Sequence, residues 1–84
     1  MNDLIDIASN HGLTIIFHKF TDPVKGIYYP LHYPPVIGLH ESLQEDLPLA
    51  RRIVIKALSY HLNAERTGSK KAYIFSKSSD IYEN

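Results

Sequence analysis

The most regular pattern of apolar and polar positions lies between residues 46 and 65. Its apolar arc, at helical spacing, is formed by Ala50, Ile53, Val54, Ala57, His61 and Ala64, and the opposite polar arc by Arg52, Lys56, Ser59 and Asn63. Asp46 is a favourable N-cap, Pro48 fits the first helical turn, and Gly68 follows the expected end. The pattern therefore predicts a long amphipathic helix from Asp46 to about residue 65.

Shorter segments before this helix are rich in β-branched and aromatic residues, which is typical of strands. They comprise residues 13–18, 26–29 and 36–40. A short helix is expected first, at residues 3–10, with Asn2 as its cap and Gly12 just after its end. Residues 71–76 have the composition of either a last strand or an extended segment.

Together these elements predict an α+β fold. We expect a small three- or four-stranded, mostly antiparallel sheet packed against one long helix, with a short N-terminal helix. Residues 1–76 would form a single domain, because 84 residues leave room for only one modest core. Residues 77–84 are mainly polar and are expected to form a frayed C-terminal tail.

The composition excludes several classes of function. Nine basic residues balance nine acidic ones, so the basic excess typical of nucleic-acid binding is missing. The chain has no cysteine, which excludes disulfides and thiolate metal sites. We expect no signal peptide and no membrane span, because the chain lacks a basic N-terminal region and a long apolar run. These features predict a cytoplasmic protein.

His61 is the most informative candidate for chemistry, because it lies within the apolar arc. Its simplest interpretation is a histidine at the core edge with one hydrogen bond. A helical metal pair would need a ligand at Ala57 or Glu65, and zinc requires three protein ligands. Ser59 lies on the opposite arc and cannot form a catalytic dyad with His61. We expect no catalytic, metal-binding or cofactor-binding residues.

Two other histidines, His18 and His40, fall near strand ends and could approach each other.

The more distinctive feature is an aromatic, proline-rich segment over residues 28–35, which suits a rigid interface. The candidate protein-binding residues are Tyr28, Tyr29, His32, Tyr33, Arg52 and Lys56. Alternatively, the tyrosines of this segment cover the core.

Four segments, in this order, resemble a known family. They read NHGLTIIF at residues 10–17, KGIYY at 25–29, VIGLH at 36–40 and RRIVI at 51–55. The order is similar to the N-terminal half of the ImmA/IrrE family, zinc-peptidase-like proteins common in phages and mobile elements. The resemblance spans about residues 4 to 65 and depends mainly on order and spacing.

The resemblance also implies that the zinc site is lost. The family motif His-Glu-x-x-His falls on Ala57-Leu58-Ser59-Tyr60-His61, where only the last histidine matches. We expect no counterpart of the family's third ligand, a carboxylate on a later helix. Loss of one imidazole and of the glutamate would remove both metal affinity and the general base.

The resemblance therefore implies a catalytically inactive regulatory protein of phage or mobile-element type, which binds a repressor or another regulator. One alternative is a small phage inhibitor that binds a host enzyme or defence protein. Another is a residual metal-dependent hydrolase completed by a partner chain. A homodimer also remains open, whereas membrane or nucleic-acid partners are not expected.

Overall fold

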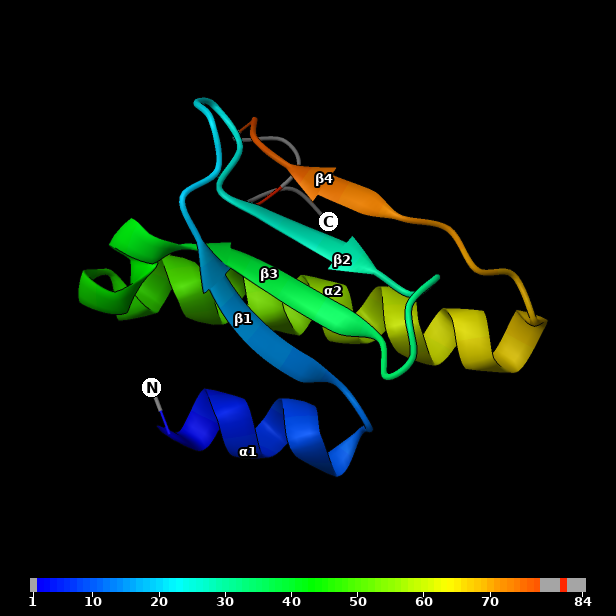
Figure 1. Ribbon diagram of the computed structural model, residues 1–84. Coiled ribbons are helices and arrows are strands. Elements are labelled where there is room, and N and C mark those ends of the chain that lie inside the picture. The colour runs from blue at the N-terminus through cyan, green and yellow to red at the C-terminus, as the bar shows by residue number, and fades with distance from the viewer. Residues whose placement is uncertain (1, 78–80, 82–84) are drawn as a thin grey trace.

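The computed structural model describes residues 2–77 and Ile81 (Figure 1). Its elements are α1 (Asn2–Asn10), β1 (Thr14–His18), β2 (Gly26–Tyr29), β3 (Val36–His40), the 3₁₀ helix η1 (Glu41–Glu45), α2 (Leu47–Thr67) and β4 (Tyr73–Phe75). The predicted α+β fold is confirmed, and the uncertain segment 71–76 contains a strand. The sequence patterns did not predict η1. No helix in the described part of the chain is long and apolar enough to span a membrane.

The four strands form one mixed sheet in the order β1-β3-β2-β4. Strand β3 pairs parallel with β1 and antiparallel with β2, and β2 pairs antiparallel with β4. Two of the three pairings are therefore antiparallel, as predicted. The edges of the sheet are β1 and β4, which leaves β2 and β3 at its centre (Figure 1).

Both α-helices lie on one face of this sheet. Figure 1 shows α2 running behind the sheet and α1 next to the edge strand β1. The buried hydrophobic residues are Leu4, Ala8, Leu13, Tyr28, Ile37, Leu39, Leu43, Ala50, Ile53, Val54, Ala57, Leu58, Phe75 and Ile81. We call the side of the sheet that faces this core the helical face and the other side the open face.

Local signals set the ends of α2 as the sequence predicts. The Asp46 carboxylate accepts a hydrogen bond from the Leu49 N–H at 3.3 Å, and Pro48 lies in the first turn. Gly68 has a left-handed φ of 75°, and its N–H donates to the Ala64 carbonyl at 2.8 Å. Only the length differs, because the helix continues to Thr67.

The short helix α1 buries only a narrow face. Leu4 and Ala8 are buried, whereas Ile7 and His11 are exposed. The helix meets both β1 and α2 at the edge of the domain, so a narrow ridge of side chains reaches the core. An ion pair at 3.1 Å between Asp3 and Arg51 links α1 to α2 at the surface.

One residue of the predicted tail belongs to the core. Ile81 is only 5% exposed and contacts the buried cluster. An aliphatic side chain in a polar segment gains free energy by burial, even when its neighbours favour solvent. Positions 78–80 and 82–84 of the predicted tail lie outside the described residues.

Candidate functional site

The inward-facing site on α2 is built around His61, which is 8% exposed. The Tyr28 hydroxyl lies 3.0 Å from its Nδ1, and the His11 carbonyl oxygen lies 3.1 Å from its Nε2. A carbonyl can only accept, so in the neutral ring Nε2 carries the hydrogen and Nδ1 accepts from Tyr28. The predicted core-edge position is confirmed, but His61 has two hydrogen bonds instead of one.

The surroundings of His61 suit packing better than catalysis. Ala57, one turn earlier, is fully buried, and Leu58 is also buried. The nearest carboxylate is Glu65, whose Oε1 lies 3.7 Å from the His61 Nε2. Within residues 2–77 and 81, no group of three His, Cys, Asp or Glu side chains could hold a metal ion. Both ring nitrogens of His61 are already hydrogen-bonded, which leaves neither lone pair nor proton for a substrate.

Tyr28 was predicted as a protein-binding residue, and this prediction is wrong. Its side chain is 0% exposed, because β2 directs Tyr28 to the helical face and Tyr29 to the open face. Burial raises the pKa of the Tyr28 hydroxyl above its ordinary value of 10.0, and Glu65 and Tyr73 add to the increase. Tyr28 is therefore a neutral hydrogen-bond donor inside the core.

The other aromatic candidates of the segment 28–35 are accessible. Tyr33 is 91% exposed, Tyr29 is also exposed, and His32 donates from Nδ1 to the Pro34 carbonyl oxygen at 3.1 Å. The sequence analysis left two interpretations of this segment open, an interface or a cover for the core. The second interpretation is correct for Tyr28. The side chains of Tyr29, His32 and Tyr33 remain available to a partner.

The open face of the sheet contains an apolar groove that the sequence analysis did not anticipate. It has a volume of about 510 Å³ and is lined by Ile16, His18, Phe20, Ile27, Tyr29, His32 and Val36. The absence of a side chain at Gly38 lets Phe20 and Ile27 pack closely beside the groove. A Cβ at this position would lie 2.9 Å from both the Phe20 ring and the Ile27 side chain. Alternation within residues 13–18 was the available signal, since it places Ile16 opposite Ile15 and Phe17.

The two strand histidines lie side by side on neighbouring strands. His18 and His40 are register partners in the parallel pair β1–β3. His18 packs edge-on against Phe20 with ring centroids 4.9 Å apart. His40 Nδ1 lies 3.1 Å from the Ser42 N–H and 2.8 Å from the Ser42 hydroxyl, so it caps η1. Their roles are therefore packing and capping.

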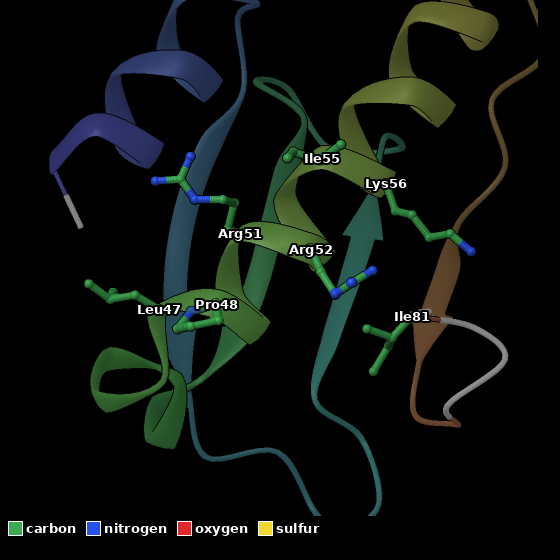
Figure 2. Close-up of a pocket in the computed structure, with 7 residues that line it drawn as sticks. All are labelled: Leu47, Pro48, Arg51, Arg52, Ile55, Lys56 and Ile81. Carbon is green, nitrogen blue, oxygen red and sulfur yellow. The ribbon is translucent and has the colours of Figure 1, made fainter. Parts of the chain in front are cut away.

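The last two candidates, Arg52 and Lys56, belong to a different region. They line a second groove, on the outer side of α2, with a volume of about 600 Å³ (Figure 2). The sequence analysis listed tyrosines and cations together as candidate protein-binding residues. The structure separates them, because α2 covers the helical face whereas Tyr29 and His32 line the open-face groove.

Comparison of the chain with protein-family models, with curated proteins and with solved structures found no match.

Proposed function

We propose that this chain is a catalytically inactive, cytoplasmic regulatory protein that binds another protein through the open face of its sheet. The observation that carries the proposal is the apolar groove beside Tyr29, on a face that no helix of the described residues covers (Figure 1). Its partner would be a repressor or another regulator of a phage or mobile element, as the resemblance to the ImmA/IrrE family implies.

The chemistry of the open face supports protein binding. Ile16 is 46% exposed, and Ile74 on β4 is exposed as well. The lining of the groove, as far as the structure describes it, contains no Lys, Arg, Asp or Glu. Apolar surface that is exposed and contiguous is a feature of interaction sites, and aromatic side chains supply much of the binding energy at interfaces.

The site around His61 supports the inactive part of the proposal. A zinc peptidase needs a metal-bound water and a general base. Position 57 provides an alanine methyl group and position 58 a leucine side chain, both within the core. The third hypothesis, a residual hydrolase, would also require His61 to release one of its two hydrogen bonds.

A site-specific photo-crosslinker tests the docking surface. Benzoylphenylalanine at position 16 would lie on the open face, and the same residue at position 59 would lie on the outer arc of α2. In the source cell, position 16 should capture one regulatory protein and position 59 should not. Capture of a second copy of the chain from position 16 would instead indicate a homodimer.

Purified components then test affinity. Ile16→Asp places a charge in the apolar groove and should abolish binding, while the circular dichroism spectrum stays unchanged because Ile16 is not buried. Tyr33→Ala should weaken binding by more than about 1 kcal/mol. Normal binding by both variants would place the interface elsewhere and contradict the proposal.

A further inference from the structure

The outer edge of β1 has backbone hydrogen-bonding groups that the sheet does not use. Within the described residues, β1 is an edge strand that pairs with β3 alone. The Thr14 N–H donates to the Pro35 carbonyl oxygen at 3.0 Å, on the β3 side. Alternate residues of a strand bond to the same neighbour, so the backbone of Ile16 also bonds toward β3. The N–H and C=O groups of Ile15 and Phe17 therefore point away from the sheet.

The opposite edge, β4, is a poorer site for another strand. The Phe75 carbonyl oxygen accepts from the Lys25 N–H at 2.8 Å, so Phe75 bonds toward β2. Ile74 is then the one residue of this three-residue strand whose backbone points outward. Lys71 and Lys77 flank β4, and lysines beside an edge disfavour pairing with another chain. By contrast, β1 has two outward residues and no charged side chain.

The outward groups determine which kind of partner can bind at the β1 edge. Ile15 and Phe17 each present one donor and one acceptor, two positions apart along the strand. An extended peptide repeats donors and acceptors at the same spacing, so its backbone can bond to all of them. A helix satisfies its backbone groups internally and would leave the edge unpaired. The edge therefore fits an extended segment of another chain.

The side chains of β1 suit the same ligand. On the open face, Ile16 is 46% exposed and lines the apolar groove. On the helical face, Ile15 and Phe17 pack against the core but are only partly buried. Successive side chains of an added strand would lie alternately on the two faces, and they would shield apolar surface from water on both.

Helix α1 exposes a further apolar side chain near this edge. The helix lies next to β1 (Figure 1). Asp3 is bonded to Arg51 at 3.1 Å, so Asp3 lies on the side of α1 that faces α2. Ile5 lies about 200° further around the helix, on the side away from α2, and it is 42% exposed. A strand that extends the sheet beyond β1 would cover this side of α1.

We propose that the regulatory partner binds by adding an extended, mainly apolar strand to the outer edge of β1. The inference rests on the proposed function, because β1 supplies Ile16 to the open-face groove. The added strand spans the five residues of β1 and bonds to the backbone of Ile15 and Phe17. One set of its side chains enlarges the open face, and the other set contacts Ile5.

Amide hydrogen exchange of the free chain, followed by NMR, tests the edge itself. The Ile16 and His18 N–H groups bond toward β3, so the Ile15 and Phe17 N–H groups should exchange at least about tenfold faster than they do. Slow exchange at Ile15 and Phe17 in dilute samples would show that the chain covers its own edge and would overturn the proposal. Protection that increases with protein concentration would identify a second copy of the chain as the occupant and would overturn the partner assignment.

A peptide probe tests strand addition. Random heptapeptides displayed on phage are selected on the full chain, and one selected peptide is synthesised with a fluorescein label. Binding should slow exchange at Ile15 and Phe17 but not at Ile74. Failure to select any peptide, or a selected peptide that leaves exchange at Ile15 and Phe17 unchanged, would overturn the proposal.

Backbone methylation locates the bound strand. N-methylation of Ile15 in a chemically synthesised chain removes one outward donor but keeps the side chain and the pairing with β3. It should weaken the peptide at least about tenfold, whereas N-methylation of Ile74, the matched change on β4, should alter its affinity less than about twofold. Circular dichroism checks that both chains fold. Equal losses for the two methylated chains would overturn the location.

The same chains distinguish this inference from the proposed function. If Ile16→Asp abolishes binding of the regulator while the chain methylated at Ile15 binds it normally, docking on the open face is correct and strand addition is wrong. If the peptide protects Ile15 while the crosslinker at position 16 captures no regulator, strand addition at β1 is supported and the proposed function is contradicted.

Discussion

The same strands make both faces of the sheet, and the two faces differ in what lies against them. On the helical face, Ile37 and Leu39 of β3 are fully buried, and Tyr28 bonds to His61. On the open face, Ile16 and Ile74 keep about half of their surface exposed to solvent. Chemically identical isoleucines therefore have different consequences, according to the face on which alternation places them.

The buried polar groups are also fully paired. In the described part of the chain, every buried side-chain nitrogen and oxygen has a hydrogen-bond partner. The helical face is thus closed, both in packing and in hydrogen bonding, and its residues mainly determine stability. The open face exposes apolar surface to solvent, which is a common feature of protein-binding sites. Four predictions test this division, from the largest expected effect to the smallest.

Truncating one isoleucine on each face should give the largest difference. Ile37→Ala removes a fully buried side chain and should lower the free energy of unfolding by about 2–5 kcal/mol through lost burial and a cavity. Ile16→Ala on the open face should cost less than about 1 kcal/mol, because much of the side chain is already in water. Urea denaturation, at several protein concentrations, measures both.

Equal costs at the two positions would contradict the division into a closed face and an open face. They would mean that the open face is covered in solution. In that case the unfolding midpoint should rise with protein concentration, as it does for a dimer. A midpoint independent of concentration, with unequal costs, supports an uncovered face.

The hydrogen bond between Tyr28 and His61 should give the second largest effect. Tyr28→Phe leaves the His61 Nδ1 without its donor, and His61→Leu leaves the Tyr28 hydroxyl without its acceptor. Each change should cost about 1–3 kcal/mol, because a buried polar group loses its partner. The double variant should cost clearly less than the sum, which a double-mutant cycle measures.

Tyr33→Phe is the matched control for this cycle. Tyr33 is almost fully exposed, so loss of its hydroxyl should change stability by less than about 0.5 kcal/mol. Strict additivity of the Tyr28 and His61 changes would show that their contact does not stabilise the helical face.

The elements with local signals were predictable from the sequence. Asp46, Pro48 and Gly68 each act within a few residues of a helix end, so both ends of α2 were placed to within two residues. The bounds of β2 and β3 follow for the same reason, because β2 begins at Gly26 and is followed by Pro30, and Pro35 precedes β3. Apolar residues at helical spacing then identified the buried side of α2.

Features that depend on distant contacts were not predictable. In β2, Ile27, Tyr28 and Tyr29 are all apolar or aromatic, so the pattern does not show which of them faces inward. The inward-facing Tyr28 bonds to His61, which is 33 residues away in the chain. The parallel pairing of β1 with β3 likewise depends on the path of the intervening chain.

The arrangement of the candidate binding residues was not predictable for a related reason. The sequence analysis grouped Tyr29, Tyr33, Arg52 and Lys56 as candidates for protein binding because all were expected to be exposed. The exposure expected for a side chain does not show on which side of the molecule it lies. Arg52 and Tyr29 line two different grooves. No periodic pattern surrounds Ile81, so its place in the core could not be predicted.

Alkaline pH should reveal a smaller effect on the helical face. The pKa of Tyr28 is raised in the folded state, mainly by burial, so the folded protein holds this proton more tightly than the unfolded chain. Its contribution is fully present below the unfolded pKa of about 10 and is lost as pH rises through the folded pKa. The stability of the wild type should therefore fall above about pH 10 more steeply than that of Tyr28→Phe.

The comparison of the wild type with Tyr28→Phe isolates the contribution of the Tyr28 hydroxyl. Tyr33→Phe again serves as the control, and its stability should follow the wild-type pH curve. The free energy of unfolding is measured by urea denaturation at each pH. If it depends on pH in the same way for the wild type and Tyr28→Phe, the Tyr28 hydroxyl is not shielded from water.

Zinc should have the smallest effect, with no change in stability. Binding at His61 would break its hydrogen bond to Tyr28 or to the His11 carbonyl, and Ala57 offers no second ligand on the helix. A ligand at a hundredfold excess over its dissociation constant stabilises a protein by about 2.7 kcal/mol, which a thermal scan would detect. We expect the same unfolding midpoint with zinc and with a chelator, for both the wild type and His61→Leu. A zinc-dependent increase that disappears in His61→Leu would show that the helical face can open around His61, and it would favour the residual-hydrolase hypothesis over the proposed function.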